Sequence, residues 1–196
     1  MKINLYTIAF LLFGFNSFAT VRFVKTNGTG DGSTWATASP SLQLMINASS
    51  LGDQIWVAGG TYKPTMDPYN SGDARNKTFY FGTDISIFGG FAGNEATLSS
   101  RDWSKYPTIL SGDIGMANNN TDNCYHVVLC QENAGKIVVF DGINITNGKS
   151  SDTGGGLFSL NANPTFNNVA FYNNYASNSG GAVQSESSTI TFTNCI

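Results

Sequence analysis

The stretch Gly154-Gly155-Gly156-Leu157 returns as Gly180-Gly181-Ala182-Val183, and Phe166-Asn167-Asn168-Val169 returns as Phe192-Thr193-Asn194-Cys195. Residue 180 follows residue 154, and residue 192 follows residue 166, by the same 26 positions without a gap. Phe140 lies one further period before Phe166. A fixed period of this length is typical of a solenoid, in which each repeat buries its apolar face only by stacking on its neighbours. The repeat therefore predicts a row of stacked coils.

Each repeated position has a structural role in such a stack. We expect the aromatic and aliphatic members to point into the column and to stack on like residues about 4.8 Å away in the next coil. The glycines permit the positive φ angles of tight corners. The asparagines are predicted to bond along a ladder to the next coil, or to their own backbone in a turn. The structural residues of the repeat are Gly154, Gly155, Leu157, Phe166, Asn168, Phe171, Asn174, Gly180, Gly181, Val183, Phe192 and Asn194.

Short strand signals, separated by Gly, Asn, Asp and Ser, continue from Gln54 to the end of the chain. No helical period follows Ser50, which excludes alternating β and α units. The choice lies between a β-sandwich and a β-helix, and the gap-free repeat favours the all-β parallel β-helix. We expect an N-terminal strand, a capping helix and the first coil in residues 20–60. Residues 61–196 are expected to form further coils, with loops projecting at residues 63–77 and 112–123.

A short helix is expected ahead of the coils. Ser39 is the predicted N-cap, a proline takes the first helical position, and Gly52 ends the helix. Leu42, Met45 and Ile46 fall on one face. This apolar face can cover the first coil, whose interior and backbone edge would otherwise meet water.

Residues 1–19 are typical of a signal peptide. Lys2 supplies a positive charge, an apolar stretch runs from Leu5 to Phe15, and small residues precede the expected cleavage site. The alternative is a membrane anchor, but the apolar stretch is shorter than the roughly 20 residues that span a bilayer. We therefore expect export, cleavage near Thr20, and no integral membrane span in the mature chain.

Charge and cysteine content limit the partners. Charged residues make up 12% of the sequence and the net charge is −3, so the chain lacks the basic patch that nucleic-acid binding needs. We expect no nucleic-acid partner. Cys124 and Cys130 are expected either to pair in an oxidising compartment or to be buried as small apolar residues. Cys195 takes the place that Val169 holds one repeat earlier, which favours burial for it.

Two sets of motifs carry a family resemblance. Gly180–Val183 together with Phe171–Asn174 resembles the GGA[I/L/V] and FxxN signatures of the polymorphic outer-membrane protein repeat. The front half resembles the N-terminal segment of exported, mostly Bacteroidetes-type right-handed parallel β-helix proteins. The runs that carry this second resemblance are Asp31-Gly32-Ser33-Thr34-Trp35 and residues 51–58, 60–65, 88–95 and 108–114.

The resemblance implies a right-handed, pectin-lyase-like β-helix that is secreted or exposed at the cell outer membrane. It implies a structural or adhesin-like passenger domain without catalysis or cofactors, whose partners are host or environmental surface glycans or proteins. Members of this family usually continue into more repeats and a C-terminal sorting domain. This sequence stops at Ile196, inside a strand of an unfinished coil, so we expect an N-terminal fragment.

An enzyme is the alternative function, because the β-helix fold also carries polysaccharide lyases and glycoside hydrolases, with carbohydrate-binding parts. A glycosidase needs two carboxylates about 5–9.5 Å apart. Asp113 and Asp141 are the candidate pair, since their separation of 28 positions is near one coil and would bring them together on adjacent turns. Aspartate beside glycine is also ordinary turn chemistry. His126, the only histidine, is a candidate acid or base, or else a strand residue in the column wall.

Three further places offer polar or aromatic groups. Asp31 lies in a glycine-rich run and is a candidate calcium ligand, although such sites need stacked copies. Arg101, Asp102 and Trp103 offer either an ion pair beside an aromatic plate for sugar stacking, or a corner fixed by that ion pair. Tyr69 stands in the first projecting loop, which is either a recognition surface or a shield for the side of the column.

Overall fold

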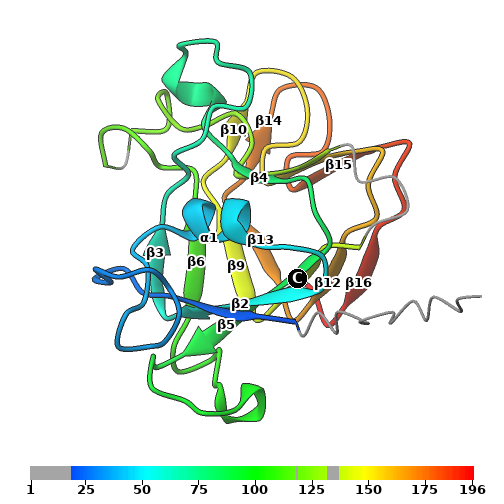
Figure 1. Cartoon of the computed structure of the whole chain (residues 1–196). Coiled ribbons are helices and arrows are strands. Elements are labelled where there is room, and N and C mark those ends of the chain that lie inside the picture. The colour runs from blue at the N-terminus through cyan, green and yellow to red at the C-terminus, as the bar shows by residue number, and fades with distance from the viewer. Residues whose placement is uncertain (1–18, 118, 132–136) are drawn as a thin grey trace, which may run out of the picture.

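The computed structural model describes residues 19–117, 119–131 and 137–196, so all of the predicted signal peptide except Ala19 lies outside the described residues. The described chain is mostly β, with one α-helix and sheets of parallel strands (Figure 1). The six-stranded sheet has the order β1 (Val21–Val24), β2 (Asp53–Ala58), β5 (Ile85–Phe91), β8 (Val139–Asp141), β12 (Thr165–Asn167) and β16 (Thr191–Thr193).

Two four-stranded sheets and one strand pair complete the β-structure of the described residues. The first has the order β15 (Val183–Glu186), β11 (Leu157–Leu160), β7 (Val128–Gln131) and β4 (Phe79–Phe81). The second has the order β13 (Ala170–Tyr172), β9 (Ile143–Thr146), β6 (Thr108–Ser111) and β3 (Gly60–Tyr62). The strand pair is β10 (Lys149–Ser150) with β14 (Tyr175–Ala176).

The chain passes through these sheets in a recurring order. From β11 it enters β12 of the six-stranded sheet, then β13, then β14, and returns to the first sheet at β15. We call one such passage a circuit. Phe140 pairs with Phe166 and Phe166 with Phe192, and Leu157 pairs with Val183, in parallel register. The hydrogen bond from Asn194 to Asn168 spans the same 26 positions. The predicted 26-residue frame is therefore confirmed for these strands.

Earlier circuits are longer than the repeat. Thr108 pairs with Ile143, 35 positions on, and Ile87 pairs with Phe140, 53 positions on. The extra residues of these two circuits lie largely between β5 and β6 and in the second predicted loop, which connects β6 to β7; the first predicted loop connects β3 to β4 and lengthens the circuit before them. The first loop contains the single turn η1 (Ala74–Asn76), and η2 (Leu98–Ser100) follows β5. The 26-residue period thus applies to the C-terminal circuits and does not extend unchanged toward the N-terminus.

The corners of the circuits are held by residues with positive φ that recur at the repeat distance. Asn tolerates this left-handed region better than most L residues, and Gly adopts it freely. An added Cβ at Gly180, where φ is 65°, would lie 2.4 Å from the Val183 carbonyl oxygen. The corner sets are Asn147 with Asn173, Gly154 with Gly180, Asn161 with Ser187, and Gly142 with Asn168 and Asn194.

Stacked side chains join successive circuits. The Phe140 and Phe166 rings lie 4.8 Å apart with an interplanar angle of 10°, and the Phe166 and Phe192 rings lie 5.4 Å apart at 17°. Asn168 Nδ2 donates to Asp141 Oδ1 at 2.9 Å, and Asn194 Nδ2 donates to Asn168 Oδ1 at 3.4 Å. Of the two roles expected for the asparagines, the ladder between circuits is the one observed.

The helix α1 (Leu42–Ala48) begins later than predicted. Ser41 is the N-cap, and its side chain accepts a hydrogen bond from the Leu44 N–H. Ser39 is wrong as the N-cap because its backbone pairs with the end of β1: its N–H donates to Phe23 O, and its carbonyl accepts from Lys25 N. The helix also ends at the cap residue Ser49, ahead of Gly52.

The apolar face of α1 is confirmed. Leu42, Met45 and Ile46 are buried in the same core cluster as the inward side chains of β2, β4 and β5. In Figure 1, α1 lies within the outline formed by the sheets. Within the part of the chain that the structure describes, no helix is long and apolar enough to cross a membrane.

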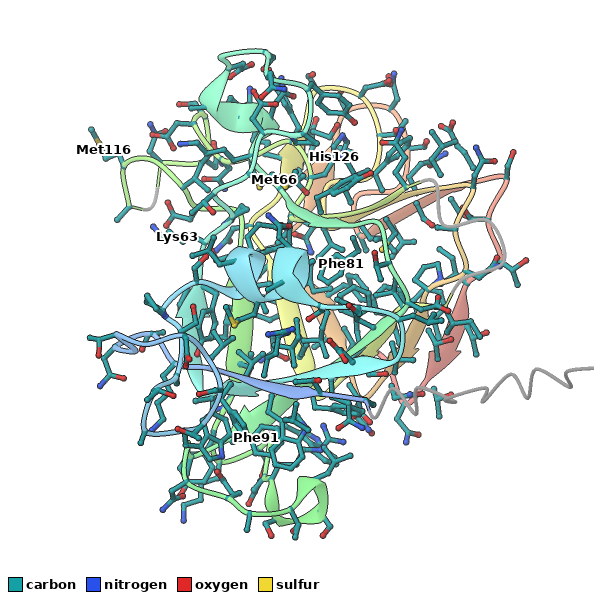
Figure 2. The ribbon with its side chains drawn as sticks, viewed as in Figure 1. Lys63, Met66, Phe81, Phe91, Met116 and His126 are labelled. Carbon is teal, nitrogen blue, oxygen red and sulfur yellow. The ribbon has the colours of Figure 1, made fainter. Side chains whose placement is uncertain are left out.

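A second aromatic cluster lies on the other side of the six-stranded sheet and was not predicted. Figure 2 places Phe81 inside the outline of the sheets and Phe91 beyond β5. Phe91 is fully buried, its ring stacks on Trp56 at 4.8 Å, and it also contacts Trp35 at 5.4 Å. The segment before α1 and the turn after β5 therefore cover this outer face.

Candidate functional site

Asp141 is engaged in a buried ion pair. Its Oδ2 lies 2.9 Å from Arg101 Nη2, and the two side chains are only 14% and 9% exposed. Arg101 also donates to the Asp141 carbonyl oxygen and packs its guanidinium over Trp103 at 4.8 Å. Asp102 was expected to be the partner of Arg101, which is wrong: Asp102 accepts from Ser104 instead. The Arg101–Asp141 pair fixes a corner of the six-stranded sheet.

Asp113 does not meet Asp141 on an adjacent turn, so that prediction is wrong. Asp113 follows β6, where Ser111 pairs with Thr146, whereas Asp141 lies in β8 and pairs with Phe88 and Asn167. The separation of 28 positions is not one circuit here, because the loop after β6 lengthens the chain between register partners. The two carboxylates lie in different surroundings and are not register neighbours.

His126 precedes β7 and is largely buried. Its Nδ1 lies 2.8 Å from the Gly154 carbonyl oxygen and therefore carries a proton, since a carbonyl only accepts. The imidazole ring stacks on the Phe158 ring, with 5.2 Å between the ring centroids. His126, Phe158 and Asp152 all line one cavity of 250 Å³. Burial lowers the pKa of His126, while the bond to Gly154 and the charge of Asp152 act in the opposite direction. These contacts fit the second alternative for His126, a residue packed in the wall formed by the strands.

Asp31 forms a local turn. Its Oδ1 accepts from the Ser33 N–H at 3.0 Å and from Ser33 Oγ at 2.8 Å. These bonds, led by the Ser33 N–H, lower the pKa of Asp31. Among the described residues, no group of three or more His, Cys, Asp or Glu side chains is placed to hold a metal ion.

Two surface features also have defined positions. Asp67 Oδ1 accepts from the Tyr69 N–H, which orders the first projecting loop and leaves the Tyr69 ring 54% exposed. Trp103 and Arg101 line a shallow 580 Å³ hollow together with Leu98 and Ser99.

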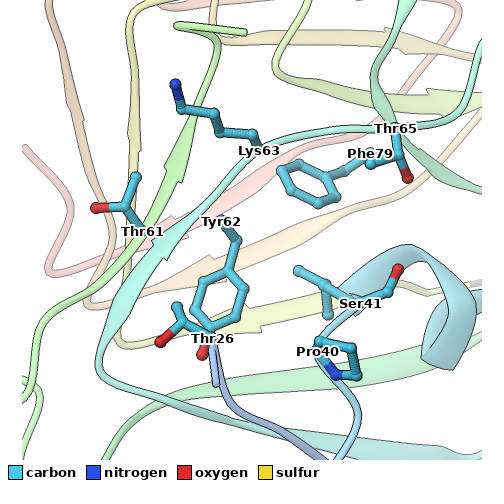
Figure 3. A pocket seen from close by; sticks show the side chains of 9 residues that line it. Thr26, Pro40, Ser41, Thr61, Tyr62, Lys63, Thr65 and Phe79 are labelled. Carbon is cyan, nitrogen blue, oxygen red and sulfur yellow. The ribbon is translucent and has the colours of Figure 1, made fainter. Parts of the chain in front are cut away.

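A 250 Å³ cavity lies between α1 and β3 (Figure 3). Tyr62 is buried at its wall, and its hydroxyl donates to the Ala58 carbonyl oxygen at 2.9 Å. Burial raises the pKa of Tyr62. In Figure 3 the Lys63 ammonium points away from the Tyr62 ring. A short segment around Pro40 completes the wall. The cavity is therefore the space left where the start of the helix packs against the sheet.

A polar hollow lies at the corner formed by β10 and β14, and we call it the asparagine cleft. Its volume is 400 Å³. A smaller cavity of 210 Å³ adjoins it, shares three of its asparagines and adds Asp113. The residues of the asparagine cleft are Asn120, Asn123, Asn147, Gly148, Lys149, Asn173 and Tyr175.

Repetition builds two walls of the asparagine cleft. Asn147 and Asn173 occupy the same left-handed corner of successive circuits, with φ of 62° and 55°. Lys149 and Tyr175 are register partners in β10 and β14. Asn174, from the FxxN motif, accepts from Gly148 N at 2.9 Å and donates to the Ile145 carbonyl oxygen at 2.9 Å. These two bonds tie the two circuits together beside the cleft.

The third wall comes from the loop after β6, and Arg75 ties it in place. Arg75 Nε donates to the Asn123 carbonyl oxygen at 2.8 Å, and Nη2 donates to the Lys149 carbonyl oxygen. Its guanidinium also lies 4.2 Å from the Tyr125 ring centroid. The first projecting loop therefore clamps the second loop against β10.

Sequence reasoning missed the asparagine cleft. The only local signals were a run of asparagines at residues 118–120 and two asparagines one period apart, at 147 and 173. Neither pattern shows that a loop from an earlier circuit closes over β10.

The cysteines of the described residues are free. Cys124 and Cys130 are buried, and burial raises the pKa of the Cys124 thiol to about 12 and also raises that of Cys130. Cys124 and Cys130 are therefore buried as small apolar residues, and they do not form the disulfide that was the other alternative. Cys195 is half-buried and packs against the core.

Comparison of the chain with protein-family models, with curated proteins and with solved structures finds no match to any of them.

Proposed function

We propose that this protein is a right-handed parallel β-helix of the exported, pectin-lyase-like kind. The observation that supports this proposal is the parallel register, in which strands of three sheets meet their copies 26 positions along the chain. A coil stack makes such a register natural, because each circuit adds one strand to each sheet. The glycine and asparagine corners agree with the motifs that carry the family resemblance.

The biochemical role that we propose is a secreted or surface-exposed structural module, adhesin-like and without catalysis. The column is rigid because stacked aromatic rings and asparagine ladders join its circuits. Loops project from it at residues 63–77, 112–117 and 119–123, which is the usual arrangement for recognition on a stable scaffold. Glycans or proteins at a host or environmental surface are the proposed partners.

Export is tested by expressing the whole chain with its leader in a Gram-negative host. Mass spectrometry of the purified protein should find an N-terminus near Thr20, and protease added to intact cells or to the medium should digest the protein. Recovery of an intact N-terminus from the cytoplasm would contradict the proposal.

A carbohydrate-active protein is the second candidate, favoured by the asparagine cleft with its exposed Tyr175. Catalysis is tested by incubating the protein with uronate polymers and neutral glycans and measuring new reducing ends or unsaturated products. Cleavage abolished by Asp113→Asn or Asp141→Asn would overturn the non-catalytic role. Thermal unfolding of each variant must be compared with that of the parent, since Asp141 holds a structural ion pair.

A further inference from the structure

We propose that the asparagine cleft binds a neutral oligosaccharide. This inference rests on the proposed function, because an adhesin-like module needs a recognition surface, and it names both the surface and the chemical class of ligand. The cleft volume of 400 Å³ lies within the range of about 300–1,000 Å³ that is usual for small-molecule sites.

One polar side-chain atom on the wall is buried without a protein partner. Asn123 is 5% exposed, and its Nδ2 donates to the Asn147 carbonyl oxygen at 2.7 Å. Its Oδ1 is buried and has no hydrogen-bond partner. A buried acceptor without a donor costs about 1–3 kcal/mol. A small rotation of the Asn123 carboxamide toward the cleft would bring this oxygen to a ligand hydroxyl, which would supply the missing donor.

Two of the other cleft carboxamides are partly engaged: Asn147 Nδ2 donates to Ser111 Oγ at 3.3 Å, and Asn120 Oδ1 accepts from Lys149 Nζ at 2.9 Å. A carboxamide whose two groups both face solvent presents an acceptor oxygen beside a donor N–H₂ group, which matches the vicinal hydroxyls of a sugar, since each hydroxyl both donates and accepts. The Asn173 side chain is exposed at the corner. Both polar groups of the Asn174 side chain bond the backbone of the neighbouring circuit, so they are not available to a ligand.

Tyr175 supplies an aromatic plate. The residue is 55% exposed and lines the cleft together with polar residues of two circuits. An exposed aromatic face beside hydrogen-bonding groups suits a pyranose ring, which has one apolar C–H face and a polar rim. The phenolic ring is thus placed to bury the apolar part of the ligand.

The charges at the cleft favour a neutral ligand. Lys149 Nζ donates to Asn120 Oδ1 at 2.9 Å and lies 6.0 Å from the Tyr175 ring centroid, so this cation is already engaged with the wall. Asp113 lines the adjoining cavity and would repel a uronate. One engaged cation and one nearby carboxylate leave little attraction for an anionic sugar.

The test is isothermal titration calorimetry of the whole purified chain against maltotriose, cellotriose, mannotriose and chitotriose, with trigalacturonate as the anionic probe. We expect at least one neutral trisaccharide to bind, with an affinity that changes little between low and high salt because no ion pair is formed. Tyr175→Ala should weaken this binding roughly three- to tenfold through loss of the aromatic plate.

Two variants make the test specific. Asn173→Gly removes the amide but keeps the left-handed backbone, and should also weaken binding. Tyr172→Ala is the matched control, because Tyr172 is an exposed tyrosine, at 40%, outside the cleft residues. It should leave binding unchanged. All three substitutions are at exposed positions, and each variant is first compared with the parent by circular dichroism and thermal unfolding.

Three results would overturn the inference: no binding of any neutral trisaccharide at millimolar concentration, equal weakening by Tyr172→Ala, or binding of trigalacturonate alone with loss on Lys149→Met. These results leave the proposed export untouched, because calorimetry on purified protein does not depend on where the cell sends the chain. Failure of export, in turn, leaves the binding result standing.

Discussion

Asn168 serves two purposes at one corner. Its backbone has φ of 53°, and its side chain donates to Asp141 Oδ1 at 2.9 Å. Asn194 repeats both the conformation and the bond direction one circuit later. Asparagine suits the position because its short polar side chain both tolerates the left-handed region and reaches the preceding circuit.

Substitutions at Asn168 separate these two roles. Asn168→Gly keeps the left-handed backbone without strain and loses the two ladder bonds, to Asp141 and from Asn194, whereas Asn168→Ala loses these bonds and also strains the backbone. We expect the alanine variant to be less stable than the glycine variant by about 1–2 kcal/mol, which is the cost of the left-handed conformation. Urea denaturation measures both free energies of unfolding. Equal stability of the two variants would show that the corner imposes no backbone strain.

His126 predicts a pH dependence. Burial holds its pKa below the ordinary value of 6.5, so the folded state binds the proton less tightly than the unfolded state. Its contribution to stability is therefore present above about pH 6.5 and is lost as the pH falls through the folded-state pKa. The single imidazole can be titrated by NMR without ambiguity. A measured pKa at or above 6.5 would contradict the environment described.

At the scale of elements, the phenylalanine ladder unites β8, β12 and β16. Phe140 and Phe166 are fully buried, whereas Phe192 is 47% exposed on the last circuit. We therefore expect the phenylalanine of β16 to contribute less to stability than the phenylalanines at the same register position in β8 and β12.

The ladder predicts unequal costs for identical substitutions. Phe166→Ala should reduce the free energy of unfolding by about 3–5 kcal/mol, because it leaves a cavity between two rings. Phe192→Ala should cost clearly less, because solvent already covers part of the ring. Phe166→Asp should abolish cooperative unfolding, since it buries an unpaired charge. Thermal and urea denaturation measure these effects. An unchanged melting temperature in Phe166→Asp would contradict the stacked arrangement.

At the scale of the whole molecule, Arg75 couples segments that are far apart in the sequence. Its bonds reach Asn123 and Lys149, which lie 48 and 74 positions along the chain. Because each acceptor is a backbone carbonyl, Arg75 sets the position of two walls of the asparagine cleft without lining it.

Loss of this clamp should be seen away from the substitution. Arg75→Met keeps the length of the side chain but removes the donors, and we expect faster amide hydrogen exchange in residues 63–77 and around Asn123. Protection in β11 and β12 should be unchanged, since these strands hold their own register partners. Exchange that accelerates equally in β11 and β12 would mean that Arg75 supports the whole column and not one corner.

Much of the C-terminal half follows from the sequence. The period is local, and identical residue types recur at identical positions, so the register of Phe140, Phe166 and Phe192 can be predicted without any knowledge of longer contacts. The apolar face of α1 follows from spacing for the same reason. The start of α1 does not, because Ser39 is held by β1, and sequence spacing carries no information on that pairing.

The sequence by itself determined the repeat, its corner residues and the inward aromatic positions, since these depend on chemistry repeated every 26 positions. Only the tertiary structure decided which partners meet across circuits of unequal length. Arg101 contacts Asp141 from 40 positions away, and the asparagine cleft gathers residues from a long loop and two later corners. The length of a loop and the contacts that hold it decide which distant residues come together. A pattern that repeats every 26 positions carries no information about these contacts.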